Sequence, residues 1–147
     1  MGRWRLYSLN SERNIAAQAT WLRHDLRAHS RRCTLAYWHR PRFSDSVHGD
    51  STRVDRLWDT FAANGGDVVL AGHDHNYQRF PRISGVRSFV VGTGGISHYN
   101  VTPRRVASYD EGHYGVLRLA LVHGSYRWVF RRIGGAAVDR GRADCRR

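Results

Sequence analysis

Two histidines, His73 and His75, stand one residue apart directly after an apolar run in the segment DVVLAGHDHNYQRF. A third histidine, His39, follows another apolar run, CTLAYW, and Pro41 forbids that strand from continuing. In an open α/β sheet, functional groups gather beyond the carboxyl ends of the strands, so neighbouring parallel strands would bring the three imidazoles to one edge. Imidazole nitrogen is a good ligand for zinc, iron and nickel. The spacing therefore indicates a metal site, and the alternative is ordinary surface histidines in a chain that has nine of them.

The first half of the chain alternates between strand and helix patterns. The sequence predicts strands over residues 3–9, 33–38 and 67–71, and helices over 15–29 and 52–63. This βαβαβ order is typical of a layered α/β domain. Gly72 follows the third strand, and we expect it to let the backbone turn sharply and approach a metal closely, where a Cβ would clash.

The second half predicts a different organisation. Strands are expected over residues 87–92, 114–121 and 126–131 with no helix between them, and the last two read as an antiparallel hairpin joined at 123–125. The segment 94–112 is long for a connection and carries several polar residues, which indicates either a functional loop or a disordered one. The predicted fold class is therefore α/β, with antiparallel strands after the βαβαβ unit.

The composition limits the possible partners. The net charge is +12, from 24 basic and 12 acidic residues, and every basic residue is an arginine. The arginines are scattered and form no stripe along one helix, so nucleic acid is an unfavoured partner. No run of about 18 apolar residues exists, which excludes a spanning helix, and we expect no membrane partner. The first residues lack the apolar core of a signal peptide, and the compartment stays open.

The two cysteines, Cys33 and Cys145, lie near opposite ends of the chain and have no CxxC spacing. A zinc knuckle or a redox dithiol is therefore disfavoured. Two unrelated small hydrophobic residues fit the pattern, and so does one long-range disulfide. A disulfide would require an oxidising compartment.

Several segments in order, WHRPRFS, LWD, GHDHNYQRF and VVGTGG, resemble the calcineurin-like metallophosphoesterases. The likeness is to the bacterial branch that is similar to purple acid and alkaline phosphatases. It covers nearly the whole chain, and we expect residues 1–147 to form part of one catalytic domain. It implies a layered α/β/β/α sandwich and a phosphoester substrate. It also implies a binuclear centre of iron, zinc or manganese, whose bound hydroxide attacks phosphorus.

The resemblance assigns roles to individual residues. His39 and His73 would bind one metal, and His75 would bind the other. Asp74 is not a ligand in that pattern, and we expect it to point outward or to orient a neighbour. His48, nine residues after His39, would bind phosphate or act as the general acid for the departing oxygen. The alternative for His48 is a loop histidine in water.

The chain departs from the family at its start, because the DxH, GDxx and GNH motifs that supply the bridging carboxylate and other ligands are absent. The resemblance therefore implies the C-terminal half of a catalytic domain, inactive alone, with open sheet edges and a separately encoded N-terminal half as its partner. If the parent is secreted or periplasmic, Cys33 and Cys145 would be bridged. The second interpretation is a non-catalytic phosphate-binding or interaction module. A nucleic-acid-binding module ranks last, since only net charge supports it.

Overall fold

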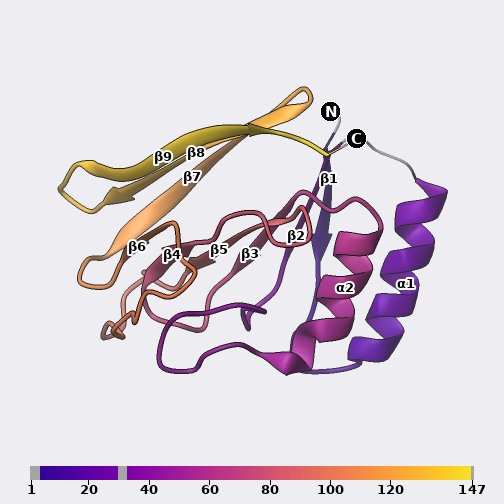
Figure 1. Cartoon of the computed structure of the whole chain (residues 1–147), viewed down its shortest axis with the longest axis horizontal. Helices are drawn as coiled ribbons and strands as arrows, with labels where there is room; N and C mark the ends of the chain where they lie inside the picture. Colours follow the sequence, from indigo (N-terminus) through magenta and orange to yellow (C-terminus); the bar gives the residue numbers. More distant parts are fainter. Residues whose placement is uncertain (1–3, 30–32, 147) are drawn as a thin grey trace.

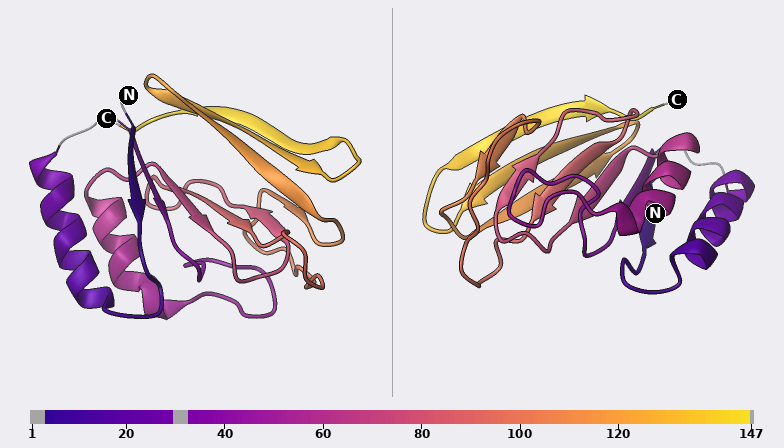
Figure 2. Two further views of the ribbon diagram at one scale, coloured as in Figure 1. Left: turned by 180° about the vertical axis from the view of Figure 1, so that it is seen from behind. Right: turned by 60° about the horizontal axis from the view of Figure 1, so that its bottom comes forward.

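The computed structural model describes residues 4–29 and 33–146 and arranges them in three layers (Figure 1). Helices α1 and α2 cover one face of a six-stranded sheet, and a three-stranded antiparallel sheet packs on its other face (Figure 2). The helical elements are α1 (Ile15–Ala28), the short 3-10 helix η1 (Thr52–Val54) and α2 (Asp55–Ala63). The large sheet holds β1 (Trp4–Ser8), β2 (Cys33–Tyr37), β3 (Val68–Ala71), β4 (Tyr77–Arg79), β5 (Arg87–Val91) and β6 (Ser108–Asp110). The small sheet holds β7 (Gly115–Val122), β8 (Ser125–Arg132) and β9 (Ala137–Asp144).

The parallel strands β1, β2, β3 and β5 form the centre of the large sheet, in the order β1-β2-β3-β5-β4-β6. Their side chains alternate between two cores. Ala36 and Val69 face the helices, whereas Leu35 and Val68 face the small sheet. Burial on both faces explains why these strands read as apolar runs. The predicted α/β fold, βαβαβ followed by antiparallel strands, is confirmed.

The small sheet is joined to the large one by an aromatic core with a buried charge in it. The rings of Tyr77 and Phe130 stack with centroids 4.0 Å apart. Asp139 on β9 accepts hydrogen bonds from the Tyr77 hydroxyl at 2.5 Å, from Arg79 at 2.7 and 3.0 Å and from Trp128 Nε1 at 3.1 Å. Burial alone would raise the pKa of the Asp139 carboxyl, but these bonds outweigh burial and lower it.

Three strands were not predicted from the sequence: β4, β6 and β9. β4 and β6 have only three residues each, too few for a periodic pattern. β9 reads AVDRGRAD, and its alternation is hidden because an outward position holds Val138 while the inward positions include Asp139. The segment 94–112, expected to be functional or disordered, contains β6. Asp45 anchors this segment by accepting the backbone N–H groups of residues 104–106.

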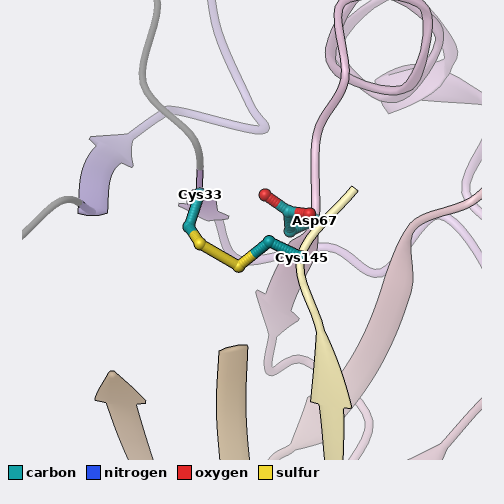
Figure 3. A group of neighbouring side chains, drawn as sticks. All are labelled: Cys33, Asp67 and Cys145. Atoms are coloured by element: carbon teal, nitrogen blue, oxygen red, sulfur yellow. A yellow bond between two sulfur atoms is a disulfide. The ribbon is translucent and has the colours of Figure 1, made fainter. Parts of the chain in front are cut away.

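A disulfide connects Cys33, at the start of β2, to Cys145, just after β9 (Figure 3). Asp67 lies beside it and accepts hydrogen bonds from the backbone N–H groups of Thr34 at 2.8 Å and Arg146 at 2.5 Å. Burial raises the pKa of the Asp67 carboxyl. The two sulfurs and this carboxylate lie within 4.8 Å of one another, but bridged sulfurs are not the thiolates that bind metals. This group therefore stabilises the fold.

The outer face of the small sheet carries no helix among residues 4–29 and 33–146, so the fourth layer of an α/β/β/α sandwich is not formed by them. Strand β1 forms one edge of the large sheet, and its Leu6 side chain is exposed. None of the described helices is long and apolar enough to cross a bilayer.

Candidate metal and phosphate site

The loops that follow β2 and β3 bring His39 and His73 together. Pairing of the two strands continues past their ends, because Gly72 N donates to the His39 carbonyl at 3.0 Å. His73 Nδ1 then lies 3.2 Å from His39 Nε2. The carboxyl edge of two adjacent parallel strands therefore presents two imidazole nitrogens to each other, as expected for functional groups in an open α/β sheet.

His48 reaches the same place from the loop between β2 and η1. Its ring centroid lies 4.3 Å from that of His73. His48 Nδ1 is 2.7 Å from Asp74 Oδ1, and the other oxygen of Asp74 accepts the Ser44 hydroxyl at 2.5 Å. Asp74 is fully buried, so the expectation that it points outward is wrong, whereas the expectation that it orients a neighbour agrees with this contact. With Nδ1 held by the carboxylate, Nε2 is the nitrogen of His48 that is free to meet a ligand.

His75 lies beside this group without joining the pair. Its Nδ1 is 3.0 Å from the Ser97 carbonyl, and its ring stacks on Tyr99 with centroids 4.1 Å apart. Since a carbonyl only accepts, Nδ1 carries the proton and Nε2 is left as the ligand atom. Tyr99 also lies 5.3 Å from the His48 ring, so the segment 94–112 forms part of the wall of the site.

The turn after β3 is built differently from the sequence expectation. His73 itself adopts the left-handed conformation, with φ of 67°, while Gly72 does not, and a Cβ on Gly72 would meet nothing closer than 3.9 Å. The sharp turn expected at Gly72 is therefore made by His73, whereas the close approach of Gly72 to a metal stays a prediction. The glycine that permits close approach is Gly92, after β5, where a Cβ would lie 2.0 Å from the Asp74 carbonyl oxygen. A strained non-glycine residue such as His73 is typical of functional sites.

Arg40 completes the group and decides its protonation. Its Nη1 lies 3.1 Å from His73 Nε2, and its Nε is 2.7 Å from Glu12. A guanidinium only donates, so the neutral His73 ring accepts at Nε2 and carries its proton on Nδ1, which donates to His39. Burial, followed by the charges of His48 and Arg40, lowers the pKa of His73. The neutral imidazole is the form that binds metals.

The nitrogen pair fits one metal ion. At metal–nitrogen distances of about 2.1 Å, two adjacent ligands of one ion lie about 3.0–3.4 Å apart, which matches the His39–His73 separation. Binding an ion between them would require the proton on His73 Nδ1 to move to Nε2, so that the ring stays neutral, and Arg40 would then give up its hydrogen bond to Nε2. A binuclear centre would also need a carboxylate that bridges the two metal ions. Within the described parts of the chain, the only cluster of three His, Cys, Asp or Glu ligand atoms is the one at the disulfide.

Four residues of this site, Ser44, Arg40, Tyr99 and Gly92, were not predicted as site residues from the sequence. Arg40 adjoins His39 in the chain, and Gly92 lies in the VVGTGG segment, so each had a weak local signal. Ser44 ends the WHRPRFS segment and had a similarly weak signal, whereas Tyr99 had none, because its contact with His75 comes from a loop that only the folded chain brings there.

No protein-family model matches the sequence, and a search of curated proteins finds no match either. Among solved structures, purple acid phosphatase PPD1 from yellow lupin seeds is similar, with a TM-score of 0.85 and 19% identity over 97% of this chain and 31% of that chain. GAP50, described as the anchor in the inner membrane complex of Plasmodium, has a TM-score of 0.74 and 11% identity over 90% of this chain and 42% of that one. A dimetal phosphatase from Danio rerio has a TM-score of 0.55 and 17% identity over 88% and 38%.

These likenesses show the fold alone, because the identities are low. The chain shares the mixed α/β fold of these three proteins, and it spans between 31 and 42% of their length. Two of them are phosphatases and one is described as an anchor. The fold is therefore compatible with both catalysis and a purely structural role, and the site must discriminate between them.

Proposed function

We propose that this chain is the C-terminal part of a metal-dependent phosphoester hydrolase of the calcineurin-like family, in the bacterial branch that resembles purple acid and alkaline phosphatases. The observation that carries the proposal is the 3.2 Å approach of His73 Nδ1 to His39 Nε2, at the carboxyl edge of parallel strands in a phosphatase-type fold. In this proposal His39 and His73 hold one metal ion of a binuclear iron, zinc or manganese centre, and His75 holds the other.

A bound metal would polarise a phosphoryl oxygen and lower the pKa of a water molecule. The chain's own residues would contribute phosphate binding and proton transfer. Asp74 holds His48 by Nδ1, so His48 Nε2 faces the site, where it can bind phosphate or give a proton to the departing oxygen. Arg40 adds a guanidinium beside the same ring, and guanidinium groups pair well with phosphate oxygens.

We further propose that residues 1–147 are inactive by themselves, and that ligands from outside these residues complete the metal centre. Neutral histidines cannot bridge two cations, and among the described residues no carboxylate forms a three-atom ligand cluster with these histidines. The test is turnover of p-nitrophenyl phosphate by the pure full-length chain with added zinc, manganese or iron. We expect none above the buffer rate. Turnover that is abolished in His75→Ala and unchanged in the surface control His24→Ala would overturn the proposed inactivity of the chain alone.

A second candidate is a non-catalytic phosphate-binding or interaction module. Arg40 favours it, because its guanidinium already occupies His73 Nε2 and could bind phosphate without a metal. Binding of inorganic phosphate separates the two functions. The module would bind phosphate in EDTA and lose it in Arg40→Gln, whereas the half-enzyme would bind phosphate only after a metal is added.

A further inference from the structure

The outer face of the small sheet concentrates positive charge. Successive residues of a strand point to opposite sides, and the outward positions of β7, β8 and β9 alternate arginines with small aliphatic residues. Five arginines are exposed there, and we name them the arginine face: Arg118, Arg127, Arg131, Arg140 and Arg142. The scattered pattern of the sequence hides this cluster, because its members come from three strands.

The arginine face is not neutralised by the chain. Arg127 lies directly opposite Arg142 across the β8–β9 pair, an arrangement of like charges that is unfavourable. The one acidic residue among the outward positions is Asp144, 3.9 Å from Arg142, and both side chains are mostly exposed. Such a pair contributes little. The other four arginines form no ion pair within the described residues.

Some arginines elsewhere in the fold are paired, whereas others on the helical side, such as Arg23 and Arg56, are exposed and form no ion pair among the described residues. Arg5, Arg79 and Arg132, for example, each contact a carboxylate at 2.7 Å or less. A general excess of arginine would leave unpaired charges anywhere on the surface. The arginine face differs from the helical side because its five arginines lie on one flat sheet surface, two of them directly opposite each other, and this arrangement suits an anionic partner.

Aliphatic residues share this side of the molecule. Val116 is 62% exposed and Ile133, at the β8–β9 turn, is 75% exposed, while Val122 and Val138 are partly exposed. Val129 and Arg118 line two adjoining hollows of about 90 and 210 Å³. The outward strand positions hold no aromatic residue. The face thus combines basic and aliphatic groups, which suits a partner with both negative charge and an apolar layer.

We propose that the arginine face docks on the surface of an anionic phospholipid bilayer. Guanidinium groups would meet lipid phosphates, and Val116 and Ile133 would enter the apolar boundary beneath them. Such peripheral binding needs no spanning helix, so it does not require the run of about 18 apolar residues that this sequence lacks.

The same observations disfavour other partners. Single-stranded nucleic acid is bound by stacking of successive bases on several aromatic residues, whereas the strand positions of this face hold none and Tyr114 lies only at its edge, beside Ile133. The major groove of DNA admits a two-stranded ribbon, whereas this sheet presents three strands side by side. A covering protein layer is the competing occupant, because the fourth layer of an α/β/β/α sandwich would lie on this face, but it would have to bury these guanidinium groups at a large desolvation penalty.

The test is cosedimentation of the full chain with vesicles of phosphatidylcholine alone and of an equal mixture with phosphatidylglycerol. We expect binding to the mixed vesicles only, and its loss in high salt. Arg118→Gln/Arg127→Gln/Arg140→Gln should weaken binding about 100-fold, since each basic residue at an anionic surface contributes about fivefold. The matched control Arg13→Gln/Arg23→Gln/Arg56→Gln, which removes equal charge from the helical side, should bind as the unmodified chain does.

Ile133→Ser should weaken binding without changing net charge, by about fivefold, because it removes an apolar side chain from the boundary. Circular dichroism and melting of each variant separate lost folding from lost binding. Equal binding to both vesicle types, or equal weakening by the two triple variants, would overturn the proposal. Binding to duplex DNA that is tighter than binding to the mixed vesicles would also overturn it, if Arg118→Gln/Arg127→Gln/Arg140→Gln weakens DNA binding and the control variant does not. That result would assign the arginine face to nucleic acid.

Discussion

Strands β2 and β3 have two ends that serve opposite purposes. At their amino ends, Cys33 is bonded to Cys145, and Asp67 has both carboxylate oxygens satisfied by backbone N–H groups. At their carboxyl ends, His39 and His73 face each other, partly exposed, beside a guanidinium and a left-handed backbone. One pair of strands thus carries a buried, fully bonded end and an incompletely satisfied end. The first stabilises the fold and the second is available for a ligand.

The largest expected loss of stability comes from removing the disulfide at the amino ends of β2 and β3. Replacing both cysteines, Cys33→Ser/Cys145→Ser, removes a cross-link across 112 residues. The loop-closure entropy of such a cross-link corresponds to about 5 kcal/mol of unfolding free energy. Urea denaturation should show a loss of this order, and a reducing agent should have the same effect on the unmodified chain only. An unchanged midpoint in the double variant would contradict the stabilising role of this end.

The turn at the carboxyl end of β3 can be disrupted through its close contact with Gly92. A Cβ there would lie 2.0 Å from the Asp74 carbonyl oxygen, so Gly92→Ala must displace the turn that carries His73 and His75. We expect a loss of about 3 kcal/mol, the upper end for overpacking. The control is Gly94→Ala, which would meet nothing within 4 Å. Equal thermal stability of the two variants would mean that the turn does not depend on Gly92.

The pH dependence of Asp67 and Asp139 should have opposite signs. The pKa of Asp67 is raised, so its stabilising contribution is complete below the unfolded value of about 4 and is lost as pH rises through the folded pKa. The pKa of Asp139 is lowered, so its contribution is complete above about 4 and is lost as pH falls through the folded pKa.

Denaturation of Asp67→Asn and Asp139→Asn across this range tests the difference. Asp67→Asn should have its larger effect in acid, within about 1–3 kcal/mol, because it disturbs a buried hydrogen-bonded group. Asp139→Asn should have its larger effect near neutral pH. Parallel pH profiles of the two variants would contradict the assigned environments.

The smallest expected effect is an increase in the free energy of unfolding. His73 adopts a left-handed conformation that costs a non-glycine residue about 1 kcal/mol, so His73→Gly should raise the free energy of unfolding by about that amount. The same variant should lose metal binding. A residue retained at a cost to stability is a functional residue. If His73→Gly destabilises the chain, the imidazole contributes more to the fold than to a ligand site.

Much of the fold could be predicted from the sequence, because the central strands are buried on both faces and their apolar runs are unambiguous. The helices were predictable from 3.6-residue periodicity, and both end within one residue of the expected positions. Strands β4, β6 and β9 could not be predicted. Their residues become strand through pairing with distant segments rather than through local pattern.

The candidate site was predictable to the extent that it depends on strand order. His39 and His73 follow adjacent parallel strands, so topology alone brings them together. The surroundings of these histidines were not predictable. The burial of Asp74 and the stacking of Tyr99 on His75 depend on how two loops fold over the edge. The arginine face was missed because period-2 alternation distributes its members over a long stretch of sequence.

Zinc binding to the full chain, measured by equilibrium dialysis, tests the central claim most directly. We predict a site that His39→Ala and His73→Ala each weaken by at least about tenfold, the loss that even outer-shell partners of metal ligands can cause. His24→Ala, which removes an exposed histidine of α1, should leave the affinity unchanged. Zinc affinity that survives both site variants, or that falls equally in His24→Ala, would contradict the assignment of the carboxyl edge of β2 and β3 as a metal site.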